Sequence, residues 1–119
     1  MIAEGVFGMR GEQGRLKEIT DLKDKYNFRL LVDDAHGFGV FESNIPINSI
    51  YMATLGKAAG TMGAFVAGNE DLIEFLIQKS RPYIYTTAIA PAICVATLKS
   101  LDLIKQVEQK TKLLANIDF

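Results

Sequence analysis

The stretch that decides the fold is Arg-Leu-Leu-Val-Asp-Asp-Ala-His-Gly, at residues 29–37. Its apolar run is uninterrupted, which is typical of a strand buried on both faces of a parallel sheet. Two acids and the single histidine of the chain follow that run. Because ligands bind at the carboxyl ends of strands in open α/β sheets, Asp33, Asp34 and His36 are candidates for a functional site. A plain turn at the strand end is the alternative.

Short apolar segments and amphipathic segments alternate along the rest of the chain. We expect strands at residues 2–7, 29–32, 50–55 and 63–67, and helices at residues 16–26, 71–79 and 91–104. Asn69 is the expected N-cap of the second helix. The third helix is apolar over most of its surface, so we expect it to be buried or to lie at an interface. The alternation predicts an α/β fold, with a mostly parallel sheet and flanking helices.

The composition limits the possible classes of function. The chain has 119 residues, of which 49% are hydrophobic, and carries a net charge of -1 without a basic stripe. One globular domain at most and no nucleic-acid partner are therefore expected. The longest apolar stretch, residues 88–98, contains Pro91 and is too short to span a bilayer. With Cys94 as the only cysteine and no signal peptide in view, we expect a cytoplasmic protein without membrane contact.

A second motif, Thr-Leu-Gly-Lys-Ala-Ala-Gly at residues 54–60, places one lysine just after an expected strand. Most lysines are solvated surface residues, and that is the alternative here. However, the small neighbours leave room for a bulky group near the backbone. A lysine desolvated in such a pocket can lose its proton and form a Schiff base. Lys57 is therefore a candidate for covalent attachment of a cofactor, and the Thr54 hydroxyl is a candidate phosphate ligand.

Two other kinds of site are disfavoured. The phosphate loop of a nucleotide-binding protein requires G-x-x-x-x-G-K-[ST], whereas Lys57 is followed by Ala58 and position 51 is tyrosine. A metal ion is not expected either, because adjacent strand residues such as Asp33 and Asp34 point to opposite faces. Residues 81–88 are expected to form an extended connector whose threonines cap the next helix or touch an anion near its start.

Four segments, in this order, resemble the α-oxoamine synthase family of pyridoxal 5'-phosphate (PLP) enzymes, which belongs to aminotransferase class I/II and to PLP fold type I. The segments are EGVFGM (residues 4–9), DDAHGFGV (33–40), IYMATLGK (50–57) and YIYTTAIAPA (83–92). Each motif alone is weakly specific, but the resemblance covers residues 2–104. On this basis residues 1–119 look like part of the PLP-binding large domain, without its N-terminal part and without the small C-terminal domain.

The resemblance implies a role for each candidate residue. Lys57 forms the Schiff base with PLP and later moves protons. Asp33 pairs with the pyridine nitrogen, and His36 hydrogen-bonds the phenolic oxygen of the ring. Thr54 binds the phosphate, and Thr87 reaches the phosphate in the neighbouring subunit of a homodimer. The implied reaction condenses an amino acid with an acyl-CoA or acyl-ACP thioester and releases carbon dioxide.

The choice of substrate and the departures from the family pattern leave alternatives open. Segments 53–57 and 63–68 favour members that condense L-alanine with a pimeloyl thioester, whereas other segments resemble glycine C-acetyltransferase and serine palmitoyltransferase. Gly8 stands where the family usually has serine, Arg10 replaces an acid, and the connection between residues 40 and 50 is short. We therefore expect little or no synthase activity from the isolated chain. A non-catalytic remnant or dimerisation module is the alternative to a truncated piece of an enzyme.

Overall fold

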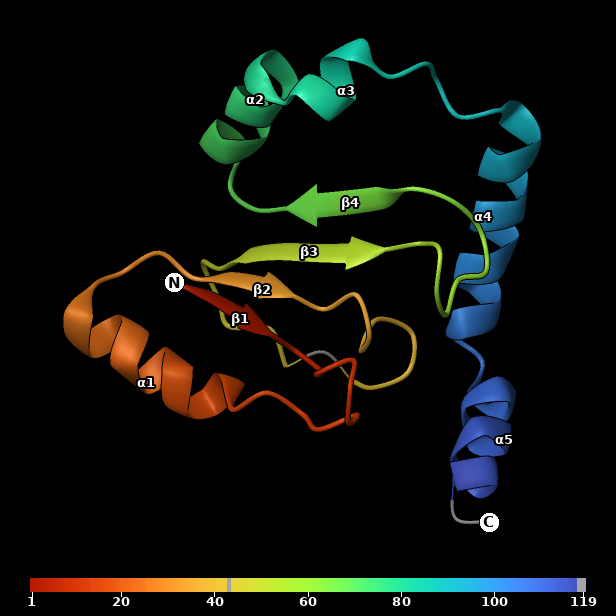
Figure 1. The fold of residues 1–119 in the computed structure, drawn as a ribbon, viewed down its shortest axis with the longest axis horizontal. Helices are drawn as coiled ribbons and strands as arrows, with labels where there is room; N and C mark the ends of the chain where they lie inside the picture. Colours follow the sequence, from red (N-terminus) through yellow and green to blue (C-terminus); the bar gives the residue numbers. More distant parts are fainter. Residues whose placement is uncertain (43, 118–119) are drawn as a thin grey trace.

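The structure, a computed structural model, describes residues 1–42 and 44–117 (Figure 1). In chain order its elements are β1 (Ile2–Glu4), α1 (Leu16–Tyr26), β2 (Leu31–Asp33), β3 (Ile50–Thr54), β4 (Ala64–Ala67), α2 (Glu70–Lys79), α3 (Arg81–Tyr85), α4 (Pro91–Ile104) and α5 (Val107–Ile117). The strands form one sheet in the order β1-β2-β3-β4. The first three strands are parallel and β4 is antiparallel to β3. The expected α/β fold with a mostly parallel sheet is confirmed.

The core is small and centred on β2. Leu30 and Val32 have no exposed surface, and the other buried apolar residues in the described ranges are Val6, Ala53 and Ala59. Strand β2 is paired along both edges, by β1 and by β3. Val32 is fully buried on one face, whereas Leu31 on the other face is half-buried, so the expected burial on both faces is complete on one face only. Ala59 belongs to the loop after β3, so the core reaches the carboxyl end of the sheet and supports the loops there.

Aromatic contacts fix the turn after β2 against the neighbouring strands. Phe65 of β4 opposes Ala53 of β3 in the antiparallel register. Its ring makes edge-to-face contacts with Phe38, at a centroid distance of 5.3 Å, and with Tyr51, at 5.7 Å. Because Phe38 lies in the turn that follows β2, these contacts hold that turn beside β3 and β4.

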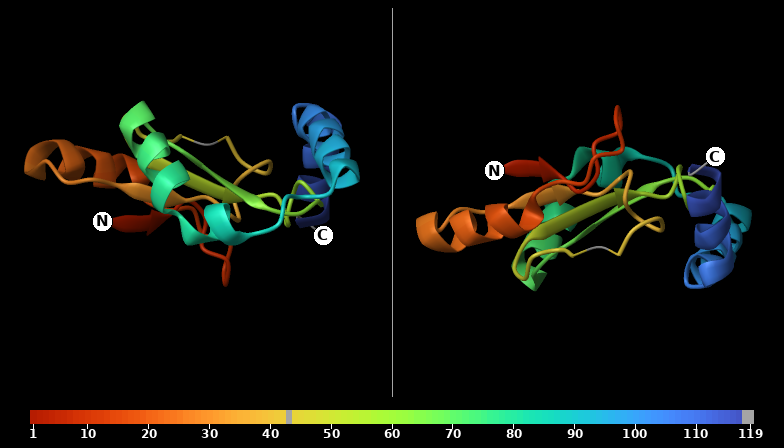
Figure 2. Two further views of the ribbon diagram at one scale, coloured as in Figure 1. Left: turned by 90° about the horizontal axis from the view of Figure 1, so that it is seen from above. Right: turned by 90° about the horizontal axis from the view of Figure 1, so that it is seen from below.

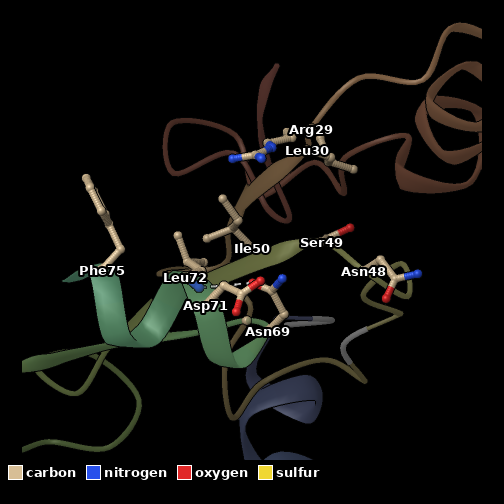
Figure 3. A pocket seen from close by; sticks show the side chains of 10 residues that line it. Arg29, Leu30, Asn48, Ser49, Ile50, Asn69, Asp71, Leu72 and Phe75 are labelled. Atoms are coloured by element: carbon tan, nitrogen blue, oxygen red, sulfur yellow. Dashed lines mark hydrogen bonds between the residues drawn. The ribbon is translucent and has the colours of Figure 1, made fainter. Parts of the chain in front are cut away.

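The start of helix α2 agrees with the sequence. The Asn69 side chain accepts a hydrogen bond from the backbone N–H of Leu72 at 3.2 Å, which is the expected N-cap (Figure 3). Glu70 and Asp71 lie in the first turn, where negative charge favours the helix. Helix α1 ends at Asn27, whose φ of 50° is left-handed and closes the helix.

The segment after α2 differs from the expected extended connector. Residues Arg81–Tyr85 form the short helix α3, in which the backbone N–H groups of Tyr83 and Ile84 donate to the carbonyl of Ser80 at 3.1 and 3.0 Å. Pro82 lies in its first turn, which proline favours because its fixed φ suits a helix start. Helix α5 was also not expected from the sequence.

Helix α4 is not buried, contrary to the first of the two expected environments. None of its described residues is buried, and Val95 and Leu98 are 67% and 66% exposed. The reason is that α4 contacts the loops at the end of the sheet along one side only. In Figures 1 and 2, α4 and α5 stand across the carboxyl ends of β2 and β3 instead of covering a face of the sheet. Within the described ranges, no helix is both long and apolar enough to cross a membrane.

Candidate functional site

The predicted residues of β2 and β3 come together at the carboxyl end of the sheet. Asp33 is the last residue of β2 and lies opposite Met52 of β3 in the parallel register. Thr54 follows Met52 by two positions, so Asp33 and Thr54 lie on the same face of the sheet. The parallel pairing therefore explains why residues 21 positions apart in sequence meet at one edge.

His36 and Lys57 are in direct contact. The Lys57 Nζ atom lies 2.6 Å from the Nε2 atom of His36, which is a short hydrogen bond. The backbone at His36 is held by the turn after β2, in which the N–H groups of Gly37 and Phe38 donate to the carbonyl of Asp34. Lys57 is held by the loop after β3, where the N–H of Gly60 donates to the Lys57 carbonyl. Two separate turns thus bring an imidazole and an amine together.

The surroundings of Lys57 are open to solvent in this chain. Both Lys57 and His36 are exposed, so a closed pocket around the lysine stays a prediction. The His36 imidazole is the polar group in contact with the amine. The sequence did not indicate this contact, since 21 residues separate the two side chains.

A cavity of about 390 Å³ lies beside this pair. His36 and Lys57 line one side, and Leu103, Ile104 and Lys110 from α4 and α5 contribute to the other. The helices contribute both apolar and polar side chains, and His36 and Lys57 lie at the strand ends. It is therefore shaped to place an organic molecule against the amine of Lys57.

A larger hollow, of about 780 Å³, lies at the opposite end of the sheet (Figure 3). Leu30 and Ile50 line it where β2 and β3 begin, together with Leu72 and Phe75 of α2. It contains none of the predicted site residues. The smaller cavity is therefore the better candidate, because reactive side chains converge there and ligand sites of α/β sheets lie at this end.

The two adjacent acids have different partners. Asp33 Oδ1 accepts a hydrogen bond from the backbone N–H of Ala35 at 3.0 Å, which orients the carboxylate within its turn. Asp34 is only 4% exposed, and its Oδ2 accepts a hydrogen bond from the Tyr51 hydroxyl at 3.0 Å. Asp34 therefore serves the packing of the turn, and Asp33 is the acid at the end of the candidate site.

The two threonines are placed differently from the other candidates. The Thr54 hydroxyl donates to the carbonyl of Gly63 at 3.1 Å and accepts from the N–H of Gly56 at 3.2 Å. A phosphate at Thr54 would have to replace its bond to Gly63. Thr87 lies in the exposed segment between α3 and α4 (Figure 1). Phosphate binding by either residue stays a prediction.

Sequence reasoning missed two residues that support the Lys57 loop. Ser100 of α4 donates to the carbonyl of Ala59 at 2.6 Å, and Thr97 donates to the hydroxyl of Thr61 at 3.0 Å. These bonds attach α4 to the loop that carries Lys57. The available signal was a pair of hydroxyl residues three positions apart in a mostly apolar helix, a spacing that places both on one face.

Comparisons with known proteins agree with this arrangement. Residues 1–117 match the sequence profile of the family described as aminotransferase class I and II. The 8-amino-7-oxononanoate synthase of Nitrosospira multiformis is 47% identical over 131 aligned positions, which cover 96% of this chain and 33% of that protein. The chain thus spans about a third of the length of that curated relative.

Solved structures give the same result. The 8-amino-7-oxononanoate synthase of Francisella tularensis superposes with a TM-score of 0.79 at 37% identity, covering 98% of this chain and 38% of that one. A structure of SPT with a PLP internal aldimine superposes with a TM-score of 0.83 at 29% identity, covering 97% and 32% of the two chains. The profile match spans nearly every residue, and the strand-end site lies within it. The chain belongs to the aminotransferase class I and II family.

Proposed function

We propose that Lys57 binds PLP as a Schiff base and that this chain is the cofactor-holding part of a PLP-dependent acyltransferase. The observation that carries the proposal is the 2.6 Å contact between Lys57 Nζ and His36 Nε2 at the carboxyl end of the sheet. The amine is exposed beside the 390 Å³ cavity, so an aldehyde could reach it. When bound, PLP supplies an electron sink for a carbanion at the α-carbon of an amino acid.

The side chains present fit this cofactor. The Lys57 amine is the nucleophile that a Schiff base requires, and the His36 imidazole beside it can take up the proton that the amine must lose. The Asp33 carboxylate can pair with a protonated ring nitrogen, because its Oδ1 is already oriented by the N–H of Ala35. Lys57 would afterwards serve as the base that moves a proton at the α-carbon of the amino acid.

For the reaction, we propose the decarboxylating condensation of L-alanine with a pimeloyl-CoA or pimeloyl-ACP thioester. The support is the 47% identity to one 8-amino-7-oxononanoate synthase and the structural likeness to another. The second candidate uses L-serine, as the likeness to SPT suggests, and a glycine-using enzyme is the third. The three candidates are distinguished by titrating the PLP-bound chain with L-alanine, L-serine and glycine. The amino acid that changes the cofactor absorbance at the lowest concentration is the preferred substrate.

Attachment of the cofactor is tested by reduction with borohydride. PLP is added to the purified chain, the Schiff base is reduced, and the modified peptide is identified by mass spectrometry. We expect the phosphopyridoxyl group on Lys57, and we expect Lys57→Ala to lose both the adduct and the yellow absorbance. Lys110→Ala is the matched control, since Lys110 lines the same cavity and its loss should leave both signals intact. An adduct spread equally over surface lysines would contradict the proposal.

Assembly and turnover are tested separately. We propose a homodimer, which gives Thr87 a partner subunit to reach, and light scattering coupled to size-exclusion chromatography measures the mass directly. A monomer that binds PLP would remove the proposed role of Thr87. We expect the chain alone to bind PLP and L-alanine while releasing little or no carbon dioxide with a pimeloyl thioester. Measurable carbon dioxide release that depends on Lys57 would instead show that residues 1–119 suffice for the reaction.

A further inference from the structure

Gly8, in the loop after β1, lies directly against the ring of His36. A Cβ atom built at position 8 would be 2.7 Å from Cε1 and 3.0 Å from Cδ2 of that ring, and it would lie closest to Nε2. Carbon atoms in contact normally stay about 3.5–4.0 Å apart. Any side chain at position 8 would therefore overlap the ring in its present place.

With the His36 ring in its present place, the space beside the ring, and not the backbone conformation, is what favours glycine at position 8 in this chain, although the family usually has serine there. Gly11, in the same loop, has a φ of 71° and so adopts a left-handed conformation, but Gly8 is not among the residues with positive φ. An alanine could therefore adopt the backbone of Gly8 without strain. The three atoms nearest to such a Cβ all belong to the imidazole, which is the mobile end of an exposed side chain.

The ring that fills this space is the ring that contacts Lys57. The Nε2 atom is the ring atom nearest to the position of a Cβ at residue 8. The same atom lies 2.6 Å from Lys57 Nζ. The backbone of the turn at residues 34–38 is hydrogen-bonded, so the ring can yield only by rotating about its own side-chain bonds. Such a rotation would move Nε2 out of the position in which it now contacts the lysine amine.

We propose that Gly8 is a positioning residue for Lys57, which acts by leaving room for the His36 ring to bind the lysine amine. The functional meaning rests on the proposed function, in which Lys57 is the amine that holds PLP. The contact itself requires no cofactor, so it can be measured on the chain alone. An unchanged His36–Lys57 contact in a Gly8 variant would therefore refute the role of Gly8, whereas absence of PLP on Lys57 would refute the proposed function.

The test uses the fact that His36 is the only histidine of the chain, so its ring nitrogens give a single set of NMR signals. Spectra of ¹⁵N-labelled protein are recorded at about pH 8.5, where imidazole rings are usually neutral. If Lys57 donates to Nε2, the ring proton resides on Nδ1, and Nε2 has the shift of an unprotonated nitrogen. We expect Lys57→Met to change the Nε2 shift, while Lys110→Met, which removes the other amine of the cavity, does not.

The role of Gly8 follows from combining the variants. In the Gly8→Ala background we expect Lys57→Met to have no further effect on the Nε2 shift, because the contact is already lost. Gly56→Ala is the matched control, since its Cβ would lie an ordinary 3.6 Å from Thr54 Oγ1 and should leave the Lys57-dependent shift intact. A full Lys57-dependent shift in Gly8→Ala would overturn the proposal.

A folding defect would also give a decisive result. If Gly8→Ala unfolds the chain, the proposal requires that the double variant Gly8→Ala/His36→Ala folds again, because the obstacle has been removed. Circular dichroism and the dispersion of backbone amide signals show which of the two occurs. A double variant that also stays unfolded would mean that the added methyl clashes with something other than the His36 ring, and the proposal would be wrong.

Discussion

The hydrogen bond between Tyr51 and Asp34 gives the sharpest prediction for stability. Asp34 is 4% exposed, and the Tyr51 hydroxyl donates to its Oδ2 at 3.0 Å. Gly5 and Gly37 pack closely against the same carboxyl group, because a Cβ atom at either position would lie 3.0 Å from Asp34 Cγ. Replacing Tyr51 by Phe removes the hydroxyl alone and keeps the ring that contacts Phe65.

The expected loss follows from the charge and burial of Asp34. A hydrogen bond to a charged group contributes about 1.5–3 kcal/mol to stability, compared with about 1 kcal/mol for a neutral pair. Asp34 keeps other interactions, and Tyr51 is itself only half-buried, so we expect the middle of that range, about 2 kcal/mol. For a chain of 119 residues this corresponds to a fall in melting temperature of about 8 °C.

Thermal and urea unfolding, followed by circular dichroism, measure this effect. The matched control is Tyr85→Phe, which removes the same hydroxyl from a ring that is 78% exposed and should change the unfolding free energy by less than about 0.5 kcal/mol. If Tyr51→Phe were as stable as the control, the hydroxyl would not be contributing to the burial of Asp34. The assignment of Asp34 to packing would then lose its support.

Three further predictions concern the core and the helix ends. Leu30→Ala should lower the unfolding free energy by about 2–5 kcal/mol in urea titrations, because Leu30 is fully buried beside β2. Asn69→Ala should cost about 1 kcal/mol through loss of the α2 N-cap, and Asn69→Ser should restore most of it. The pKa of Glu18 is lowered first by a hydrogen bond from its backbone and next by Arg15, so Arg15→Ala should raise that pKa only part of the way to its ordinary value. Because a lowered pKa stabilises the ionised form, the contribution of Glu18 to folding is lost as the pH falls through that pKa. NMR titration of the Glu18 carboxyl carbon in the variant and parent chains checks both statements, and an unchanged pKa in the variant would contradict the first.

The places of the strands along the chain could be predicted because local patterns determine them. The apolar run before Asp33 and the capping pattern at Asn69 each depend on a few neighbouring residues, and both are confirmed. The family follows from motifs of the same local kind. In contrast, the contact between His36 and Lys57 depends on how two turns are placed by the sheet, which no single window of sequence contains.

The errors have the same origin. Helix α3 was missed because a one-turn helix at residues 81–85 carries no periodic pattern of its own. Of the two environments expected for α4, burial within this chain is wrong and an interface stays a prediction, because an apolar composition shows that a surface prefers to be covered but not what covers it. The packing role of Asp34 could not be separated from the role of Asp33 by sequence, since the two residues are adjacent and chemically identical.

The attachment of α4 to the Lys57 loop has a spatial consequence. Ser100 and Thr97 bind the carbonyl of Ala59 and the hydroxyl of Thr61, two and four residues beyond the lysine. The opposite side of the helix, with Val95 and Leu98, faces outward. A partner that packed on that outer side would therefore contact the same helix that holds the Lys57 loop, with only one helix diameter between the contact surface and the loop.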